Sequence, residues 1–247
     1  MTRDPDLQQL TLNLPFATSY HPADFAESAC NADALSSVRN YREWPSYGLC
    51  VVGDKGSGKT HLASIYHFES PTALSLAPED VKKNRIFEIA ANHIIIDDAD
   101  LVKDEKAFFH LINLVKERKG RLFITATTPP SSWKIRLPDL KSRLCSLPVV
   151  KLHAPDKTLL HDILLKLFSD RQMSVDPDLS DYIISHIQED IKILEDLVGW
   201  LHEEVSISRK PLSKAIFRNV LFAHTDIMND AAKERFLGII PKAQNNF

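Results

Sequence analysis

The residues whose types and spacing most plainly suggest chemistry lie between Gly53 and Thr60, where the chain reads Gly-Asp-Lys-Gly-Ser-Gly-Lys-Thr. This octapeptide matches the phosphate-binding pattern G-x-x-x-x-G-K-[ST]. Glycines at these positions let backbone N–H groups converge on phosphate oxygens, and the N-terminus of a following helix adds its partial positive charge. An apolar segment precedes the pattern and a helical segment follows it, which favours a phosphate site over a glycine-rich turn.

Each residue type in this loop has an expected role. Lys59 would reach the β- and γ-phosphates of a bound nucleotide, and the Thr60 hydroxyl would ligate Mg²⁺. The expected nucleotide-binding residues here are Gly53, Lys55, Gly56, Ser57, Gly58, Lys59, Thr60 and His61.

Two carboxylates follow a second apolar segment, because residues 93–96 read His-Ile-Ile-Ile and lead directly into Asp97 and Asp98. In phosphate-loop proteins, an aspartate at the carboxyl end of a strand holds Mg²⁺, which makes Asp97 the expected metal residue. Asp98 is then placed to polarise an attacking water as a general base. The alternative for this Asp-Asp-Ala-Asp stretch is a solvent-exposed turn.

Strands alternating with helices must position these groups. We expect strands at residues 47–52, 73–76, 93–96, 122–126 and 149–152, with helices at 32–42, 59–68 and 105–119 between them. This order predicts an α/β fold with a parallel five-stranded sheet.

Only helices are expected after residue 154, at residues 156–171, from 176 onward, at 190–203 and at 213–224. Asp156 is a plausible N-cap, and Asp176 followed by Pro177 suits a helix start. The predicted organisation is an N-terminal segment (1–17), a nucleotide-binding α/β domain (18–153), a small helical lid domain (154–225) and a tail (226–247).

Composition narrows the class of protein. The chain has 247 residues, a net charge of −3 and only 7 glycines, three of them between residues 53 and 58. No apolar run reaches the ~18–20 residues of a membrane span. Three scattered cysteines predict a reducing cytoplasm, and no zinc-ligand spacing occurs. The slightly acidic charge argues against strong nucleic-acid binding by the protein as a whole, although local patches remain open.

Four segments, in this order, resemble the AAA+ ATPases of the DnaA bacterial initiator family. They are Gly-Lys-Thr-His-Leu-Ala at 58–63, Ile-Ile-Ile-Asp-Asp at 94–98, Thr-Ala-Thr-Thr-Pro-Pro at 125–130 and Leu-Lys-Ser-Arg-Leu at 140–144. The resemblance covers about residues 18–205. It implies an AAA+ core that binds ADP or ATP with Mg²⁺.

The resemblance also implies further site residues. Thr127 resembles the polar sensor that follows the fourth strand, and Arg143 resembles an arginine finger that serves a partner's nucleotide. Lys192 stands where the family carries a second-sensor arginine, and a lysine lacks the planar fork for bidentate phosphate contact. Arg143 and Lys192 could instead be ordinary surface residues. Residues 20–25 either line an adenine pocket or belong to the core.

The N-terminal segment reads Gln-Leu-Thr-Leu-Asn-Leu at 9–14 and is similar to peptides that bind the replicative sliding clamp. The expected clamp-binding residues are Gln9, Leu10, Leu12 and Leu14. An edge strand or an apolar tether is the alternative. If the lid ends near 225, about 20 residues remain, so we expect no intrinsic DNA-binding domain of the kind that DnaA initiators carry.

Taken together, these features most resemble the regulatory inactivators within the DnaA-related family. The expected function is negative regulation of replication initiation in the bacterial cytoplasm, near the replisome. The expected partners are DnaA and the sliding clamp (the β subunit of DNA polymerase III), with homo-oligomers possible and no membrane contact. The protein would activate ATP hydrolysis on DnaA more than turn over itself. The alternatives are a helicase loader or other DnaA-like adaptor, and a small-metabolite kinase.

Overall fold

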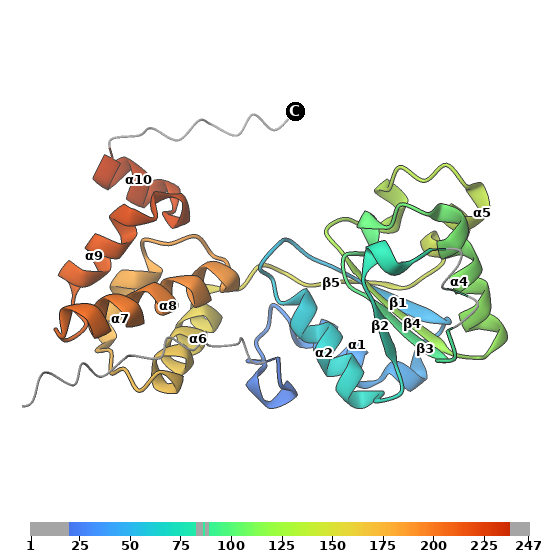
Figure 1. Ribbon diagram of the computed structural model, residues 1–247, viewed down its shortest axis with the longest axis horizontal. Helices are drawn as coiled ribbons and strands as arrows, with labels where there is room; N and C mark the ends of the chain where they lie inside the picture. Colours follow the sequence, from blue (N-terminus) through green and yellow to red (C-terminus); the bar gives the residue numbers. More distant parts are fainter. Residues whose placement is uncertain (1–19, 83–85, 87–88, 238–247) are drawn as a thin grey trace, which may run out of the picture.

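The computed structural model describes residues 20–82, 86 and 89–237, and these form two parts joined near residue 154 (Figure 1). An α/β domain contains the sheet, and a helical domain follows it. The expected clamp-binding residues lie outside the described residues, so clamp binding stays a prediction.

The sheet consists of β1 (Gly48–Val52), β2 (Leu74–Leu76), β3 (His93–Ile96), β4 (Arg121–Ala126) and β5 (Val149–Lys151). Their order in space is β2-β3-β4-β1-β5, and every pair is parallel. This confirms the predicted five-stranded parallel sheet. The predicted bounds differ from the observed ones by no more than one residue at any strand end. Because all strands point the same way, their carboxyl ends share one edge of the sheet.

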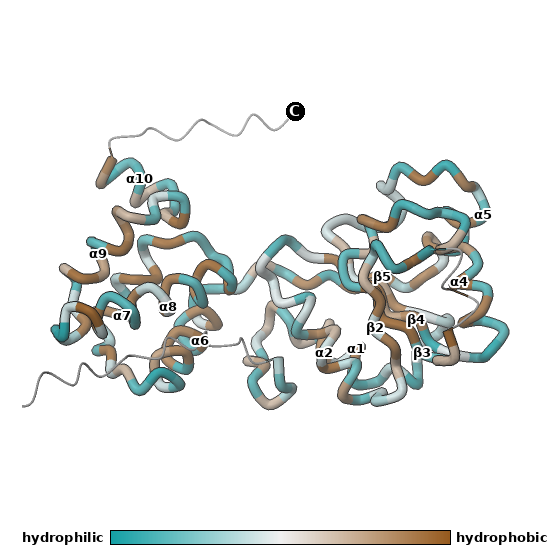
Figure 2. The backbone as a smooth tube through the Cα atoms, in the orientation of Figure 1, coloured by the Kyte–Doolittle hydropathy of each residue, from teal (hydrophilic) through white to brown (hydrophobic). Residues whose placement is uncertain are grey.

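Helices cover both faces of the sheet. On one face lie α1 (Ala32–Arg39) and α2 (Lys59–Glu69), which pack against Ile95 and Phe123. The other face carries α4 (Glu105–Glu117) and α5 (Pro138–Cys145), which pack against Ile94, Ile96 and Ile124. Successive strand residues point to opposite faces, so strands buried on both faces are apolar throughout. Figure 2 shows this as hydrophobic colouring concentrated in the strands.

An aromatic stack fixes α2 to the sheet. The ring centroids of Tyr66 and Phe123 lie 5.0 Å apart, and those of Trp44 and Tyr66 lie 5.4 Å apart. The predicted helix at 32–42 ends earlier, at Arg39, and a short 3₁₀ turn at Tyr41–Glu43 follows it.

The helical domain contains α6 (Lys157–Asp170), α7 (Pro177–Ile184), α8 (Ile191–Ser208), α9 (Lys214–Ala223) and α10 (Asp230–Leu237). The predicted caps are confirmed, because the side chains of Asp156 and Asp176 accept backbone N–H bonds from the first turns of α6 and α7. Helix α8 continues beyond the predicted end at 203 to Ser208, since Val205 still packs on the helical core.

The predicted end of the lid at residue 225 is too early. Ile227, Met228 and Ala232 are buried in the core of the helical domain. Met228 forms an antiparallel bridge with Ile187, and the Gln188 N–H donates to the Ile227 carbonyl. Residues 226–237 therefore belong to the helical domain, because they pair with a loop some 40 positions earlier in the sequence.

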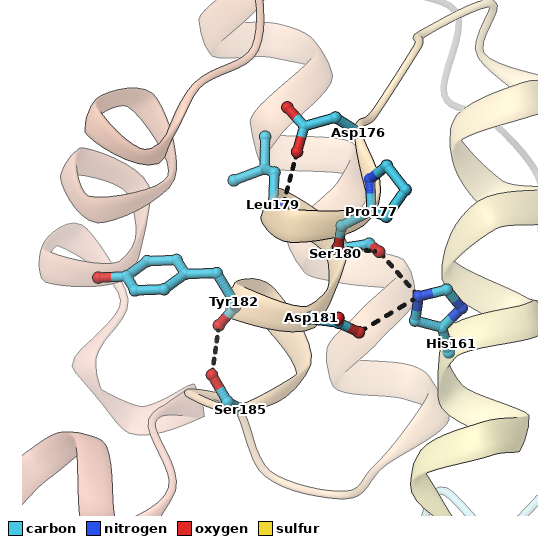
Figure 3. A network of polar contacts seen from close by, with 8 residues as sticks. All are labelled: His161, Asp176, Pro177, Leu179, Ser180, Asp181, Tyr182 and Ser185. Atoms are coloured by element: carbon cyan, nitrogen blue, oxygen red, sulfur yellow. Dashed lines mark hydrogen bonds and ion pairs between the residues drawn. The ribbon is translucent and has the colours of Figure 1, made fainter.

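Helices α6 and α7 are joined by a polar contact that Figure 3 shows in detail. The His161 Nε2 atom lies 2.8 Å from the Ser180 hydroxyl and 3.5 Å from a carboxylate oxygen of Asp181. A catalytic triad needs the serine and the aspartate on different ring nitrogens. Here one nitrogen meets both, and Ser180 is fully buried, so this grouping is structural.

Two glycines offer a matched test of the packing. A Cβ atom at Gly120 would lie 1.7 Å from the Asn92 carbonyl oxygen, whereas one at Gly199, inside α8, would meet nothing within 4 Å. We expect Gly199→Ala to raise the free energy of unfolding by about 0.5–1 kcal/mol, because alanine favours helices. Gly120→Ala should lower it, since backbone must shift. Urea denaturation measures both; a neutral Gly120→Ala would contradict this packing.

Candidate nucleotide-binding site

The predicted phosphate loop connects β1 to α2 at the carboxyl edge of the sheet. Gly56 and Gly58 have φ angles of 72° and 98°, in the left-handed region that favours glycine. The Ser57 hydroxyl donates to the Asp54 carbonyl at 2.8 Å and holds the loop in its curve. Helix α2 begins at Lys59, so its free N–H groups face the same loop.

Lys59 is buried inside this curve with only neutral acceptors. Its ammonium donates to the carbonyl oxygens of Gly53 at 3.0 Å and Asp54 at 2.9 Å. Among the described residues no carboxylate lies within 4.0 Å of it. A buried cation without a paired charge favours an anion nearby, which is what a phosphate chain supplies.

The acidic edge of the site is held by two threonines. The Thr60 hydroxyl donates to one oxygen of Asp97 at 2.6 Å, and the Thr125 hydroxyl donates to the other. Thr125 also accepts the Asp98 N–H at 2.9 Å. Thr60 and Asp97 therefore lie together, as expected for residues that share a magnesium ion with phosphate oxygens.

Sequence reasoning missed the role of Thr125. Thr125 is fully buried in β4. The register between β3 and β4 pairs Ile96 with Ile124, so the residues that follow them, Asp97 and Thr125, lie beside each other. A lone hydroxyl in the otherwise apolar stretch Leu-Phe-Ile-Thr-Ala was the signal that could have found it.

Asp98 faces the cavity with a strained backbone, because its φ of 53° lies in the left-handed region. Burial raises the pKa of its carboxyl, and the negative charge of Asp97 raises it further. Thr127 also borders the cavity, but its hydroxyl donates to Asp100 at 2.6 Å. Both residues are thus near the expected phosphate positions, and their catalytic roles remain predictions.

The helical domain contacts the phosphate loop directly. The Ile191 N–H at the start of α8 donates to the Gly56 carbonyl at 3.3 Å. A Cβ atom at Gly56 would lie 2.1 Å from the carboxylate of Asp190, the N-cap of α8. Lys192, the residue after Ile191, borders the cavity and forms ion pairs with Asp196 at 2.8 Å and Glu195 at 3.8 Å.

These parts enclose a cavity of about 570 Å³ between the two domains. Tyr20 and Phe25 line it and meet the His61 ring edge-on, with centroids 5.7 and 5.1 Å away. Phe25 also packs against the core beside α2, so it matches both alternatives given for residues 20–25, and an adenine pocket there stays a prediction. Leu159 and Ile163 of α6 add apolar surface. The lining of the cavity therefore combines cationic and N–H groups of the phosphate loop with the aromatic rings of Tyr20 and Phe25.

Arg143 is not among the residues that line this cavity. It lies on α5, half-buried, with its guanidinium 5.1 Å from the centre of the Phe109 ring. The structure thus separates Arg143 from this chain's own phosphate loop.

Two kinds of feature are absent from the residues that the structure describes. No group of three His, Cys, Asp or Glu side chains could hold a metal ion there, so Mg²⁺ at Thr60 and Asp97 would depend on nucleotide oxygens. Within the same residues, no helix has the length and apolarity to cross a membrane.

Comparison with known proteins places these features in context. No family model matches the chain. It is 26% identical to the chromosomal replication initiator protein DnaA of Leifsonia xyli over 85% of this chain and 50% of that protein, so it spans about half the length of the relatives it matches. Its fold matches domain III of Thermotoga maritima DnaA (TM-score 0.71, 16% identity, 87% of this chain, 100% of the other).

A second solved structure of similar fold is AMPPCP-bound DnaA from Aquifex aeolicus, with TM-score 0.61, 15% identity, and coverage of 71% of this chain and 62% of the other. The chain is thus similar to DnaA in sequence, and it shares the fold of DnaA domain III. The fold predicted from the resemblance is confirmed.

The raised pKa of Asp98 gives a test of the charge balance in the site. A carboxyl whose pKa is raised on folding stabilises the protein less as pH rises through that pKa. We expect Asp98→Asn, which tolerates the left-handed backbone, to raise the free energy of unfolding at pH 7. The gain should shrink as pH falls toward the usual carboxyl range. Urea titrations at pH 7 and pH 4 measure this; an equal gain at both would contradict it.

Proposed function

We propose that this DnaA-like AAA+ domain binds ADP or ATP, with Mg²⁺, in the cavity between its two domains. The buried Lys59 and the glycine loop suit the phosphates, and the rings of Tyr20 and Phe25 suit the base. Thr60 and Asp97 would hold the magnesium ion beside the phosphates. The fold-related DnaA that carries AMPPCP supports an adenine nucleotide.

We infer further that the chain regulates replication initiation by acting on DnaA. The observation that carries this proposal is the place of Arg143 on α5, outside the chain's own cavity, with its guanidinium over the Phe109 ring of α4. An arginine so placed can serve the γ-phosphate of a neighbouring AAA+ protein, where such a finger contributes about 10³–10⁵ in rate. DnaA-bound ATP would then be hydrolysed, leaving the inactive ADP form.

The proposed link to the replisome is the peptide at residues 9–14. Its support is the sequence pattern alone, Gln9, Leu10, Leu12 and Leu14, because these residues lie outside the described structure. Bound to the sliding clamp, it would bring the protein to replicating DNA. That combination is the role of Hda-type regulatory inactivators, which the sequence resembles.

The second-sensor position supports activation of a partner over turnover by the chain itself. The Lys192 ammonium already pairs with Asp196 and Glu195, and a lysine cannot grip a phosphate with two parallel N–H bonds. These two carboxylates therefore partly offset the positive charge that Lys192 could present to a γ-phosphate.

The test is DnaA's ATP hydrolysis in the presence of clamp loaded on DNA. We expect the wild-type chain to stimulate hydrolysis and Arg143→Ala to lower that stimulation by at least about 100-fold, because the finger charge is lost. Lys141→Ala, an exposed change on the same helix, is the matched control and should stimulate normally. Unchanged stimulation by Arg143→Ala would show that Arg143 is not the finger.

A second experiment tests the contribution of clamp binding separately. The double variant Gln9→Ala/Leu10→Ala should lose both clamp pull-down and clamp-dependent stimulation while retaining nucleotide binding. If wild type and variant alike fail to bind the clamp, the regulatory proposal fails. Binding to a replicative helicase with no effect on DnaA would point instead to a helicase loader.

A further inference from the structure

A group of cations and aromatic rings lies at the far end of the helical domain, on α7, α9 and α10, away from the nucleotide cavity (Figure 1). On α9, Lys214, Arg218 and Phe222 follow one another at intervals of four residues, so they share one side of the helix. We call this group the cationic–aromatic surface; it comprises Tyr182, Lys214, Arg218, Phe222, Arg235 and Phe236.

The cations of this surface lie against rings. Lys214 Nζ is 5.2 Å from the centre of the Tyr182 ring, and the Arg218 guanidinium is 5.7 Å from the same ring. The Phe236 ring has Arg218 at 5.8 Å and Arg235 at 5.6 Å. Tyr182 leaves α7 on the side opposite to His161 (Figure 3). Ring contacts of this kind hold the charged groups in place without neutralising them.

No carboxylate neutralises these charges within the described part of the chain. Asp181, Asp230 and Glu234 lie on the same helices, yet none comes within 4.0 Å of Lys214, Arg218 or Arg235. The Arg218 Nε–H donates to the Tyr182 hydroxyl at 2.9 Å, and its remaining N–H donors have no hydrogen-bond partner among the described residues. Three unpaired cations therefore stand together in a chain whose net charge is −3.

An exposed ring completes the surface. Phe222 is 47% exposed, and its ring centre lies 5.8 Å from that of Phe236. A ring left in water beside three cations matches what single-stranded nucleic acid offers, which is bases that stack and phosphates that carry charge. An acidic peptide would use the cations but has no general need for the ring.

We propose that the cationic–aromatic surface binds single-stranded nucleic acid without sequence preference. Lys214, Arg218 and Arg235 contact the phosphates, and a base stacks on Phe222. The surface is remote from the nucleotide cavity, so the failure of one proposal would leave the other standing.

The test uses the full chain and a fluorescently labelled oligothymidine of about 15 nucleotides, followed by fluorescence anisotropy between about 50 and 200 mM salt. Binding should weaken with salt, with a slope of log K against log salt near about −2, because each single-strand phosphate contact contributes about −0.7. Lys214→Glu/Arg218→Glu should lower affinity at least about tenfold and flatten the slope.

Two further variants guard against trivial results. Lys106→Glu/Lys141→Glu makes the same charge change at exposed positions of the α/β domain and should bind much more tightly than the surface variant. Phe222→Leu keeps the apolar bulk but removes the ring; it should lower affinity about tenfold and leave the salt slope unchanged. Circular dichroism checks that each variant folds.

Several results would overturn the proposal. One is that wild type does not bind the oligonucleotide at the lowest salt concentration. Another is that the surface variant and its control lose the same amount of affinity. A third is that Phe222→Leu leaves the affinity unchanged. Tighter binding of a labelled polyglutamate peptide than of the oligonucleotide would assign the surface to an acidic protein instead.

Discussion

The close approach of α8 to Gly56 is the contact on which the candidate site depends. The α8 N-terminus donates a hydrogen bond to the phosphate loop, and the Asp190 carboxylate occupies the space that any side chain at Gly56 would need. At this point the helical domain contacts the phosphate loop. The wall of the cavity therefore combines residues from both domains. A ligand that fills the cavity touches both domains and stabilises their arrangement relative to the unfolded chain.

The site itself is a balance of opposite charges held close together. Among the described residues Lys59 lies buried without a paired carboxylate, while Asp97 and Asp98 follow β3, which β4 separates from β1. Burial and the like charge of Asp97 raise the pKa of Asp98, and a cation bound beside these carboxylates would offset their charge. The two threonines on Asp97 limit its freedom, which places the acid beside the phosphate loop before any ligand arrives.

Local pattern was enough to predict the glycine-rich loop between β1 and α2, the strand that precedes Asp97 and the helix caps, because each is encoded within about ten residues. Contacts between distant segments were harder to predict. The role of Thr125 depends on the register between β3 and β4, and the end of the helical domain depends on Ile227 and Met228 packing beside Ile187. The contact of Asp190 with Gly56 depends on how the two domains meet. Residues 9–14 remain a prediction from sequence.

If one nucleotide joins the phosphate loop and the helical domain through Lys59, binding of that nucleotide should stabilise the fold. Thermal and urea unfolding of wild type and Lys59→Ala, with and without Mg²⁺ and ADP, measures this stabilisation. We expect ADP at 100 times its Kd to raise the free energy of unfolding of wild type by about 2.7 kcal/mol, and the same concentration to have little effect on Lys59→Ala. Equal stabilisation of both proteins, or of neither, would contradict this expectation.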